Sequence, residues 1–434
     1  MNEINHCSVR HFIKSNDARR EYGREAFLTC SIEEKAGKYK ASKKGGRMKN
    51  AVEPLPRIED FVKRPTFSVK GPIGRSKSTD QIFVRAGHGE VDIDTRGVGP
   101  SSPPPHPLDR VMYAPCMLRA HLWKIREPKP LKWKVEVPDK AKMSAHIKET
   151  ARYLGADLVG ITRLHQEFVF ENDRSGEPID ASNFTHAIIV AKAMDYDRIQ
   201  TTPSWCDHVE VGKRYQEEGV LTTTLAIYIA ELGYRARASF AGADSVLYVP
   251  LAVYAGLGEL SRIGIMLTKQ YGPRVRLGAV LTDLPLEIDH PIDLNVGSFC
   301  ESCKKCATNC PTGAIAAKEK TEVKGVMKWK VNEVACYRYW RKDPMNWQDC
   351  IRCVAVCPWN KPNTSFHRGV AGIVSNYPSS HKAINFMDDL FYGKKPKRKD
   401  QPASFNDYRM TEEQYMQMIQ DPEINIKFLA PEKH

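Results

Sequence analysis

The sequence predicts a mixed α/β protein, in which a layered core of strands and helices carries a separate cysteine-rich segment. Two observations point to this class. Between residues 141 and 295, short apolar stretches typical of strands alternate with stretches whose apolar residues recur at helical spacing. Eight of the twelve cysteines then fall between Cys300 and Cys357. With 434 residues, 41% of them hydrophobic, the chain is long enough for one large domain and a smaller one.

Helical spacing and stop signals place two helices in the core. One apolar face runs from Ile147 to Leu154 and a second from Leu221 to Leu232, and a glycine directly follows each of them. Between and after these helices, apolar stretches predict strands at residues 158–161, 186–194, 246–249 and 276–282.

The composition divides the chain into four parts. Residues 1–140 are rich in Lys, Arg, Pro and Gly, and they include the stretch SSPPPHP at 101–107, so we expect an irregular N-terminal region that wraps the core. Residues 141–295 form the α/β core, residues 296–362 the cysteine-rich insert and residues 363–434 a C-terminal closing segment.

The chain is strongly basic, with a formal net charge of +13. Such a balance suits nucleic acid, an anionic membrane surface or an acidic electron-transfer partner. Much of the excess lies in two runs, residues 42–49 and 394–399, which glycine or proline interrupts. We interpret both runs as solvated surface.

The sequence contains no targeting or membrane-spanning signal that we recognise. No run of about 18 apolar residues occurs, and the first 23 residues lack the apolar segment of a secretory signal. Arg19 and Arg20 form a twin-arginine pair, but no apolar stretch follows them. We therefore expect a cytoplasmic protein, or a membrane-associated periplasmic one if an export signal is missing from this chain.

The first cysteine motif reads C-x-x-C-x-x-C-x-x-x-C-P and ends at Pro311. This is the spacing of bacterial ferredoxins, in which three thiolates bind one [4Fe–4S] cluster and the fourth binds a second cluster. The motif's ligand candidates are Cys300, Cys303, Cys306 and Cys310.

A second, incomplete motif follows, with only Cys350, Cys353 and Cys357 before Pro358. Cys336, fourteen positions before Cys350, is the candidate for the missing member. The ferredoxin crossing rule then predicts two complete sets. Cluster A would be bound by Cys300, Cys303, Cys306 and Cys357, and cluster B by Cys310, Cys336, Cys350 and Cys353.

Zinc is the alternative to iron and sulfur, because C-x-x-C pairs also build structural zinc sites and eight thiolates could hold two zinc ions. The complete C-x-x-C-x-x-C-x-x-x-C-P run is typical of iron–sulfur proteins, so the sequence favours two [4Fe–4S] clusters. A nicotinamide or nucleotide site is not indicated. Gly256, Gly258 and Gly264 lack the G-x-G-x-x-G spacing, and no P-loop occurs.

Several motifs together resemble the corrinoid-dependent reductive dehalogenases. AGLGELSRIG at 255–264, YGPRVRLGAVLTDLPL at 271–286 and FCESCKKCATNCPTGAI at 299–315 occur in that family's order and spacing. LGADLVGI, MDYDRIQTTPS and DDLFYG are similar too, and the resemblance covers about residues 140–393. It implies a nitroreductase-like core that holds a base-off corrinoid (cobalamin) and a ferredoxin-like insert with the two clusters. It also implies the reaction of R–X with two electrons and a proton to give R–H and halide.

The resemblance assigns roles to residues of the core. Tyr215, in GKRYQEEGVLTTTLA, corresponds to the family's proton donor, and a nearby cation, Arg274 or Arg276, would steady its phenolate. Residues two apart on a strand share a face, so the sequence leaves both arginines open. From the residues alone, Tyr215 is better explained as a core tyrosine at a helix start, and the resemblance favours the functional role. Ala243 stands where family members carry an asparagine, which removes one substrate-side hydrogen bond. No D-x-H-x-x-G motif for a lower cobalt ligand occurs.

Two other functions stay open at this point. An epoxyqueuosine reductase-like enzyme would also combine a corrinoid with two clusters and would act on tRNA, whereas an iron–sulfur electron carrier would have no substrate site. The dehalogenase interpretation implies a small organohalide substrate and no nucleic acid. It also implies an external low-potential donor (a ferredoxin, a flavodoxin or a membrane donor) and a small membrane anchor protein as a further partner.

Overall fold

A computed structural model describes residues 54–93, 118–342, 350–401 and 410–420. The basic run at 42–49 and the proline-rich stretch at 101–107 lie outside these residues. The chain divides into two compact units, residues 1–53 and residues 54–434. The second unit contains the predicted core and insert, and the three predicted boundaries at 140, 295 and 362 stay predictions.

The core is a four-stranded sheet in the order β2–β3–β7–β4, and every pairing in it is antiparallel. The strands are β2 (Leu158–Arg163), β3 (His186–Ala193), β7 (Val275–Thr282) and β4 (Ala236–Ser239). The helices packed on it are α3 (Lys140–Tyr153), α5 (Trp205–Glu231) and α6 (Tyr248–Tyr254), while α4 (Tyr196–Ile199) precedes α5. The predicted mixed α/β class is confirmed, with an antiparallel sheet.

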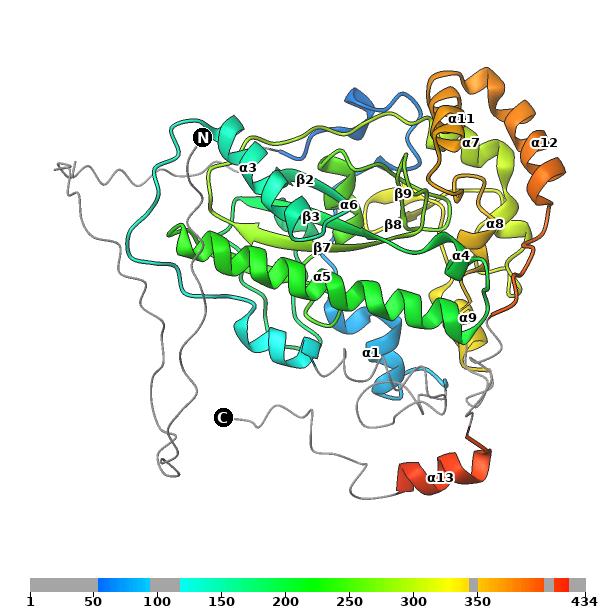
Figure 1. The fold of residues 1–434 in the computed structure, drawn as a ribbon, viewed down its shortest axis with the longest axis horizontal. Coiled ribbons are helices and arrows are strands. Elements are labelled where there is room, and N and C mark those ends of the chain that lie inside the picture. Colours follow the sequence, from blue (N-terminus) through cyan, green and yellow to red (C-terminus); the bar gives the residue numbers. More distant parts are fainter. Residues whose placement is uncertain (1–53, 94–117, 343–349, 402–409, 421–434) are drawn as a thin grey trace, which may run out of the picture. The chain divides into compact units, whose positions relative to one another are not determined.

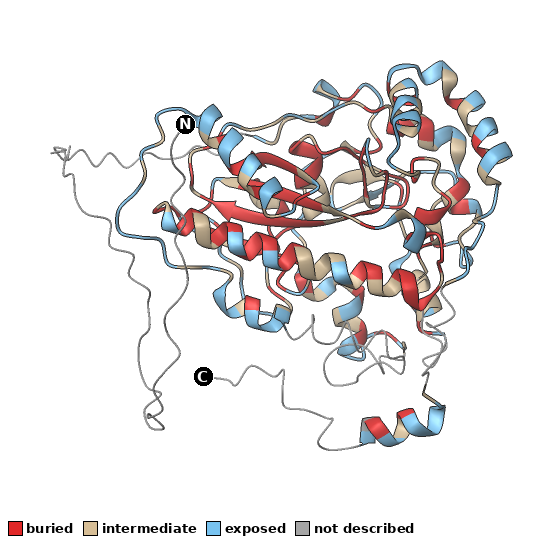
Figure 2. Ribbon diagram, in the orientation of Figure 1, coloured by how far each residue is buried: buried red, intermediate tan, exposed pale blue. Residues whose placement is uncertain are grey.

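The two faces of the sheet are both buried, which explains why β3 reads as a continuous apolar run (Figures 1 and 2). Successive side chains of a strand point to opposite faces. Ile188 and Val190 join the apolar cluster of α3 and α5, whereas Ala187 and Ile189 join that of α6. The face beneath α5 matters most for the site, because β7 presents Arg276 and Gly278 there together with Val280.

The predicted strand at 246–249 is wrong. Val246 makes one isolated bridge with Val169, and α6 begins at Tyr248. Pro250 lies in the first turn of α6, where its missing N–H costs no helical hydrogen bond, so the local sequence favours a helix start. The sequence analysis also missed β4, a four-residue edge strand of small and polar residues.

Helix α5 is much longer than the predicted face at 221–232, because it begins at Trp205. Its start is a capping box: the Ser204 side chain accepts from the Asp207 N–H, and the Asp207 carboxylate accepts from the Ser204 N–H. At the other end Gly233 has φ of +85°, as a helix-terminating glycine requires. Tyr215 therefore lies in the middle of a helix and not at its start.

The insert folds from short elements around the cysteines. Its elements are α7 (Val296–Cys303), α8 (Lys305–Thr308), β8 (Thr321–Val323), β9 (Val326–Lys328), α9 (Glu333–Trp340) and α10 (Arg352–Ala355). Strand β1 (Ser68–Val69) pairs with β9, so the N-terminal region is joined to the insert. The remaining helices are α1 (Ile82–Gly87), α11 (Ser365–Asn376), α12 (His381–Tyr392) and α13 (Glu412–Gln420). No described helix is long and apolar enough to cross a membrane.

Candidate functional site

The cysteines predicted to bind cluster A come together from two segments of the insert. Cys300 and Cys303 lie on α7, Cys306 lies on α8, and Cys357 follows α10. Lys304 adopts a left-handed conformation, with φ of +57°, which lets the chain turn between the two helices. The pKa of Cys357 is raised well above its ordinary value, first by burial and then by the nearby thiols of Cys303, Cys300 and Cys306.

The remaining four cysteines form a second set beside the first. Burial raises the pKa of Cys353. The neighbouring thiols raise it further, and they belong to Cys350, Cys306, Cys336 and Cys310. The Ala314 N–H donates to the Cys310 sulfur over 3.3 Å, a contact of the kind that tunes iron–sulfur clusters. Four partly buried thiols in each set match the donor chemistry of a cubane, because a bound metal deprotonates its thiol ligands. Among the described residues, no three His, Cys, Asp or Glu side chains are placed to hold a single metal ion.

Arg262, which the sequence analysis missed, fastens the insert to the core. Its side chain is almost fully buried and donates to the carbonyl of Cys300 from Nη2 (2.8 Å) and to that of Ala316 from Nη1 (2.8 Å). The guanidinium also lies 3.9 Å from the centre of the Trp329 ring. Arg262 belongs to the AGLGELSRIG motif, so that motif was the available signal for its role.

Glu259, in the same motif, holds the chain where the insert begins. Its Oε1 accepts from the backbone N–H of Leu294 over 2.7 Å and of Val296 over 3.2 Å. The side chain is only 2% exposed, and this burial raises the pKa of Glu259 to about 7 although both hydrogen bonds favour the carboxylate.

Glu259 should make the stability of the protein pH-dependent near neutrality. Its pKa is about 7 in the folded chain and about 4.3 in an unfolded one, so the folded state binds the proton more tightly. The stabilisation is complete below the unfolded pKa and is lost as the pH rises through the folded pKa. Between about pH 6 and pH 8 the loss amounts to about 1.4 kcal/mol of the free energy of unfolding.

Urea unfolding of the parent protein and of Glu259→Gln under anoxia, across this pH range, measures the effect. The variant keeps an acceptor oxygen but cannot titrate, so the difference in unfolding free energy between the two proteins should change with pH by this amount. A constant difference would show that Glu259 is already ionised in the folded chain.

Tyr215 lies where the core meets the insert. It is half-buried and packs against an apolar cluster that includes Met194 and Val211 of the core. Cys306, Cys310 and Cys353 pack against that same cluster. The predicted proton donor and the cysteines therefore border one common apolar region.

The structure separates the two arginines that the sequence left open. The Arg276 guanidinium lies 5.1 Å from the centre of the Tyr215 ring. Arg274 precedes β7, which begins at Val275, so the alternation of the strand does not govern it. Its guanidinium donates instead to the carbonyls of Met194 (2.6 Å) and Lys361 (3.2 Å), and thereby joins the core to the insert. Geometry thus selects Arg276 as the cation beside Tyr215.

Glu218, one helical turn after Tyr215, is a further polar residue that the sequence analysis missed. Its side chain is fully buried, and no described residue gives either carboxylate oxygen a hydrogen bond of normal geometry. Burial, followed by the nearby Asp244, raises the pKa of Glu218 well above its ordinary value, although Arg276 lowers it in part. Gly278 leaves room for this side chain, since a Cβ there would lie 2.6 Å from the Glu218 Cγ. Burial therefore disfavours the ionised form of Glu218.

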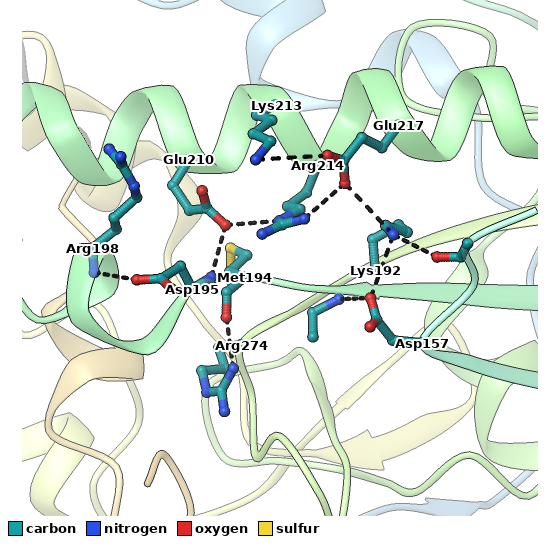
Figure 3. A network of polar contacts seen from close by, with 12 residues as sticks. Asp157, Lys192, Met194, Asp195, Arg198, Glu210, Lys213, Arg214, Glu217 and Arg274 are labelled. Atoms are coloured by element: carbon teal, nitrogen blue, oxygen red, sulfur yellow. Dashed lines mark hydrogen bonds and ion pairs between the residues drawn. The ribbon is translucent and has the colours of Figure 1, made fainter. Parts of the chain in front are cut away.

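A polar network fixes the part of α5 that carries Tyr215 (Figure 3). Buried Glu210 accepts from Arg214 Nε and from the Asp195 N–H, each over 2.7 Å. Arg214 also donates to Glu217 over 2.8 Å, and Glu217 pairs with Lys192 of β3. The helix is thus tied to β3 and to the loop that follows it, which limits movement of Tyr215 relative to β7.

Comparisons of the sequence find relatives both for the insert and for longer parts of the chain. Residues 299–361 match the family described as a 4Fe-4S dicluster domain, which confirms the iron–sulfur interpretation of the insert over zinc. The ligand role of each cysteine stays a prediction. The tetrachloroethene reductive dehalogenase of Desulfitobacterium hafniense is 32% identical over 312 residues, which cover 60% of this chain and 55% of that protein. The epoxyqueuosine reductase of Vibrio cholerae is 32% identical over 148 residues, covering 32% of this chain and 38% of that protein.

The fold is likewise similar to that of a reductive dehalogenase. A solved reductive dehalogenase structure, described in terms of B12-dependent dehalogenation, has a TM-score of 0.68 and 26% identity, and covers 78% of this chain and 50% of that chain. The chain spans about half the length of the curated dehalogenases that it matches. In both sequence and fold, the chain is similar to the reductive dehalogenases, as the motifs predicted.

Proposed function

We propose that this chain is a reductive dehalogenase that removes halide from a small organohalide. The observation that carries the proposal is the position of Tyr215, which has Arg276 over its ring and borders the apolar region where the insert's cysteines lie. A proton donor and a source of electrons are the two things that reductive loss of halide requires. Similarity to dehalogenases over the core and the insert supports the same assignment.

A corrinoid fits the residues between core and insert. Asn360 is fully buried, and neither atom of its amide has a partner among the described residues; the Nε atoms of Trp359 and Arg276 likewise have none there. Unpaired buried polar atoms are costly, so such atoms point to a missing polar partner. The rim of a corrinoid carries carboxamides, which can both donate and accept. When bound, its cobalt supplies the low-valent metal chemistry that weakens a carbon–halogen bond.

The protein's own residues would handle the proton and the charge. In R–X + 2e⁻ + H⁺ → R–H + X⁻, we assign the proton to the Tyr215 hydroxyl, because a pocket without bulk water needs a positioned acid. The Arg276 guanidinium, which forms no ion pair among the described residues, would stabilise the phenolate that remains. Arg274 would position the loop at Lys361 and take no part in proton transfer.

Metal content and substrate turnover test this proposal. Protein reconstituted under anoxia should contain about eight iron atoms and one cobalt per chain. It should release halide with reduced viologen from at least one member of a substrate panel, with tetrachloroethene and 3-bromo-4-hydroxybenzoic acid as the first members. Iron without cobalt would leave an electron carrier, and cobalt without halide release from any of the substrates would contradict the dehalogenase assignment.

A further inference from the structure

An open hollow reaches one of the cysteines of the proposed cluster A from outside. It has a volume of about 440 Å³, and Cys303 lines it together with Ser302 and Thr308. Phe386 and Lys382 of α12, and Lys394 just after that helix, line its outer part. Since Cys303 is a predicted ligand, this hollow marks a place where an external molecule can come close to cluster A.

An apolar surface continues from this hollow over α12 and α11. Phe386 is 67% exposed, Leu390 64% and Phe366 73%. We call this surface the α11–α12 face; its exposed apolar members are Phe366, Ile373, Tyr377, Phe386, Met387, Leu390 and Phe391. A groove of about 220 Å³ between the two helices has Phe299 and Trp359 among its lining residues, and both belong to the apolar cluster beside the cluster A cysteines. Contiguous apolar surface of this kind usually marks an interaction site.

Positive charge surrounds the α11–α12 face. Exposed Lys382 and Lys394 line the hollow, and exposed Lys304 directly follows Cys303. The two carboxylates of α12 that could offset them, Asp388 and Asp389, are already paired with Lys305 and Lys361. Lys382 and Lys394 form no ion pair among the described residues, so the charge that lines the hollow is positive, which favours a partner with an acidic surface.

The α11–α12 face is held firmly on the insert. Buried Lys305 of α8 donates to Asp388 and lies 2.6 Å from Asp389, while Lys361 lies 2.7 Å from Asp388. The Asn309 side chain donates to the Lys394 carbonyl over 2.9 Å. Figure 1 shows α12 beside α7 and α8, so a partner seated on the face would be held in a fixed position relative to the cysteines.

We propose that the α11–α12 face is the docking surface for a small acidic one-electron donor protein of the ferredoxin class, which reduces cluster A. Each encounter oxidises the donor by one electron and reduces cluster A by one, and two encounters supply one dehalogenation. The proposal rests on the proposed function for the two clusters. It adds the surface at which cluster A receives electrons and the kind of protein that supplies them. Apolar contact would hold the donor, and the lysines would speed its approach.

Rapid mixing with a reduced acidic ferredoxin tests the proposal, with bleaching of the clusters as the readout. Lys382→Glu/Lys394→Glu should slow bleaching by about tenfold or more at low salt, and the rate should lose most of its dependence on salt. Phe386→Ser should slow it without changing the salt dependence. Reduction by viologen, which needs no docking, should be unchanged in both variants. Lys132→Glu, a matched reversal of an exposed lysine in the N-terminal region, should behave as the parent.

Three outcomes would overturn the proposal. Ferredoxin could reduce the charge-reversed protein as fast as the parent, or viologen reduction could slow equally, which would indicate damage to the cluster. The face could instead bind anionic phospholipid vesicles or a second copy of the chain in sedimentation, with ferredoxin reduction unchanged. The proposed function fails separately, because halide release with viologen does not depend on this face.

Discussion

Tyr215→Phe should lower the rate of halide release by about two to four orders of magnitude, which is the usual span for a lost general acid. The substitution keeps the ring that packs between Arg276 and the apolar cluster, and removes only the transferable proton. The variant should therefore keep its clusters and its corrinoid, as measured by iron and cobalt content and by absorbance. Steady-state assays with viologen as the reductant give the rate.

Tyr228→Phe provides a matched control on the same helix. Its hydroxyl lies 2.7 Å from His146 Nε2, on α3 and away from the insert, so its loss should leave turnover close to the parent rate. Arg276→Gln should also slow turnover, because the cation beside the phenolate is lost. If the Tyr215→Phe protein dehalogenates at the parent rate, Tyr215 serves only in packing.

Cys357→Ala and Cys336→Ala should each remove one cluster and leave the other. The crossing rule gives Cys357 to cluster A although it follows the cluster B cysteines in the sequence, and the surrounding thiols of Cys300, Cys303 and Cys306 agree with that assignment. Each variant should contain about four of the parent's eight iron atoms. Halide release should fall to background in both, because electrons then no longer pass through both clusters to the proposed corrinoid.

The double variant separates crossing from simple sequence order. If Cys336 and Cys357 serve different clusters, the double variant should hold no intact cluster. If both serve one cluster, it should hold as much iron as either single variant. Cys206, a buried thiol at the start of α5, is the control, and Cys206→Ala should keep the full iron content. An unchanged iron content in Cys336→Ala would make Cys336 a structural thiol.

The cysteine-rich insert was largely predictable from the sequence because its chemistry is local. Seven of its eight candidate ligands lie in two motifs whose short spacings predict which sulfurs can converge. The strands β2, β3 and β7 and the end of α5 at Gly233 were also readable, since apolar period and glycine stop signals depend on neighbours in the chain. The resemblance to the dehalogenases was readable too, from motifs that lie in the core as well as in the insert.

Weak or misleading local signals produced the errors. Val246 to Val249 read as a strand from β-branched residues, but Pro250 and the tertiary packing of α6 favour a helix. The first half of α5 was missed because Glu210 and Glu218 interrupt its apolar face. Both side chains are buried in the fold by elements that pack on the helix. An acidic residue on a helix reads as exposed unless its burial is known.

Only the tertiary structure decided the candidate site. Arg274 and Arg276 are equivalent by strand alternation. The choice between them came from the start of β7 after Arg274, from the approach of Tyr215 to Arg276 and from the hydrogen bond of Arg274 to Lys361. Lys382, Phe386 and Lys394 were unremarkable in the sequence until the fold put them beside Cys303. Spacing along the chain therefore determined which groups could bind clusters. Contacts between residues distant in the sequence determined their arrangement, because such contacts depend on packing that no local pattern encodes.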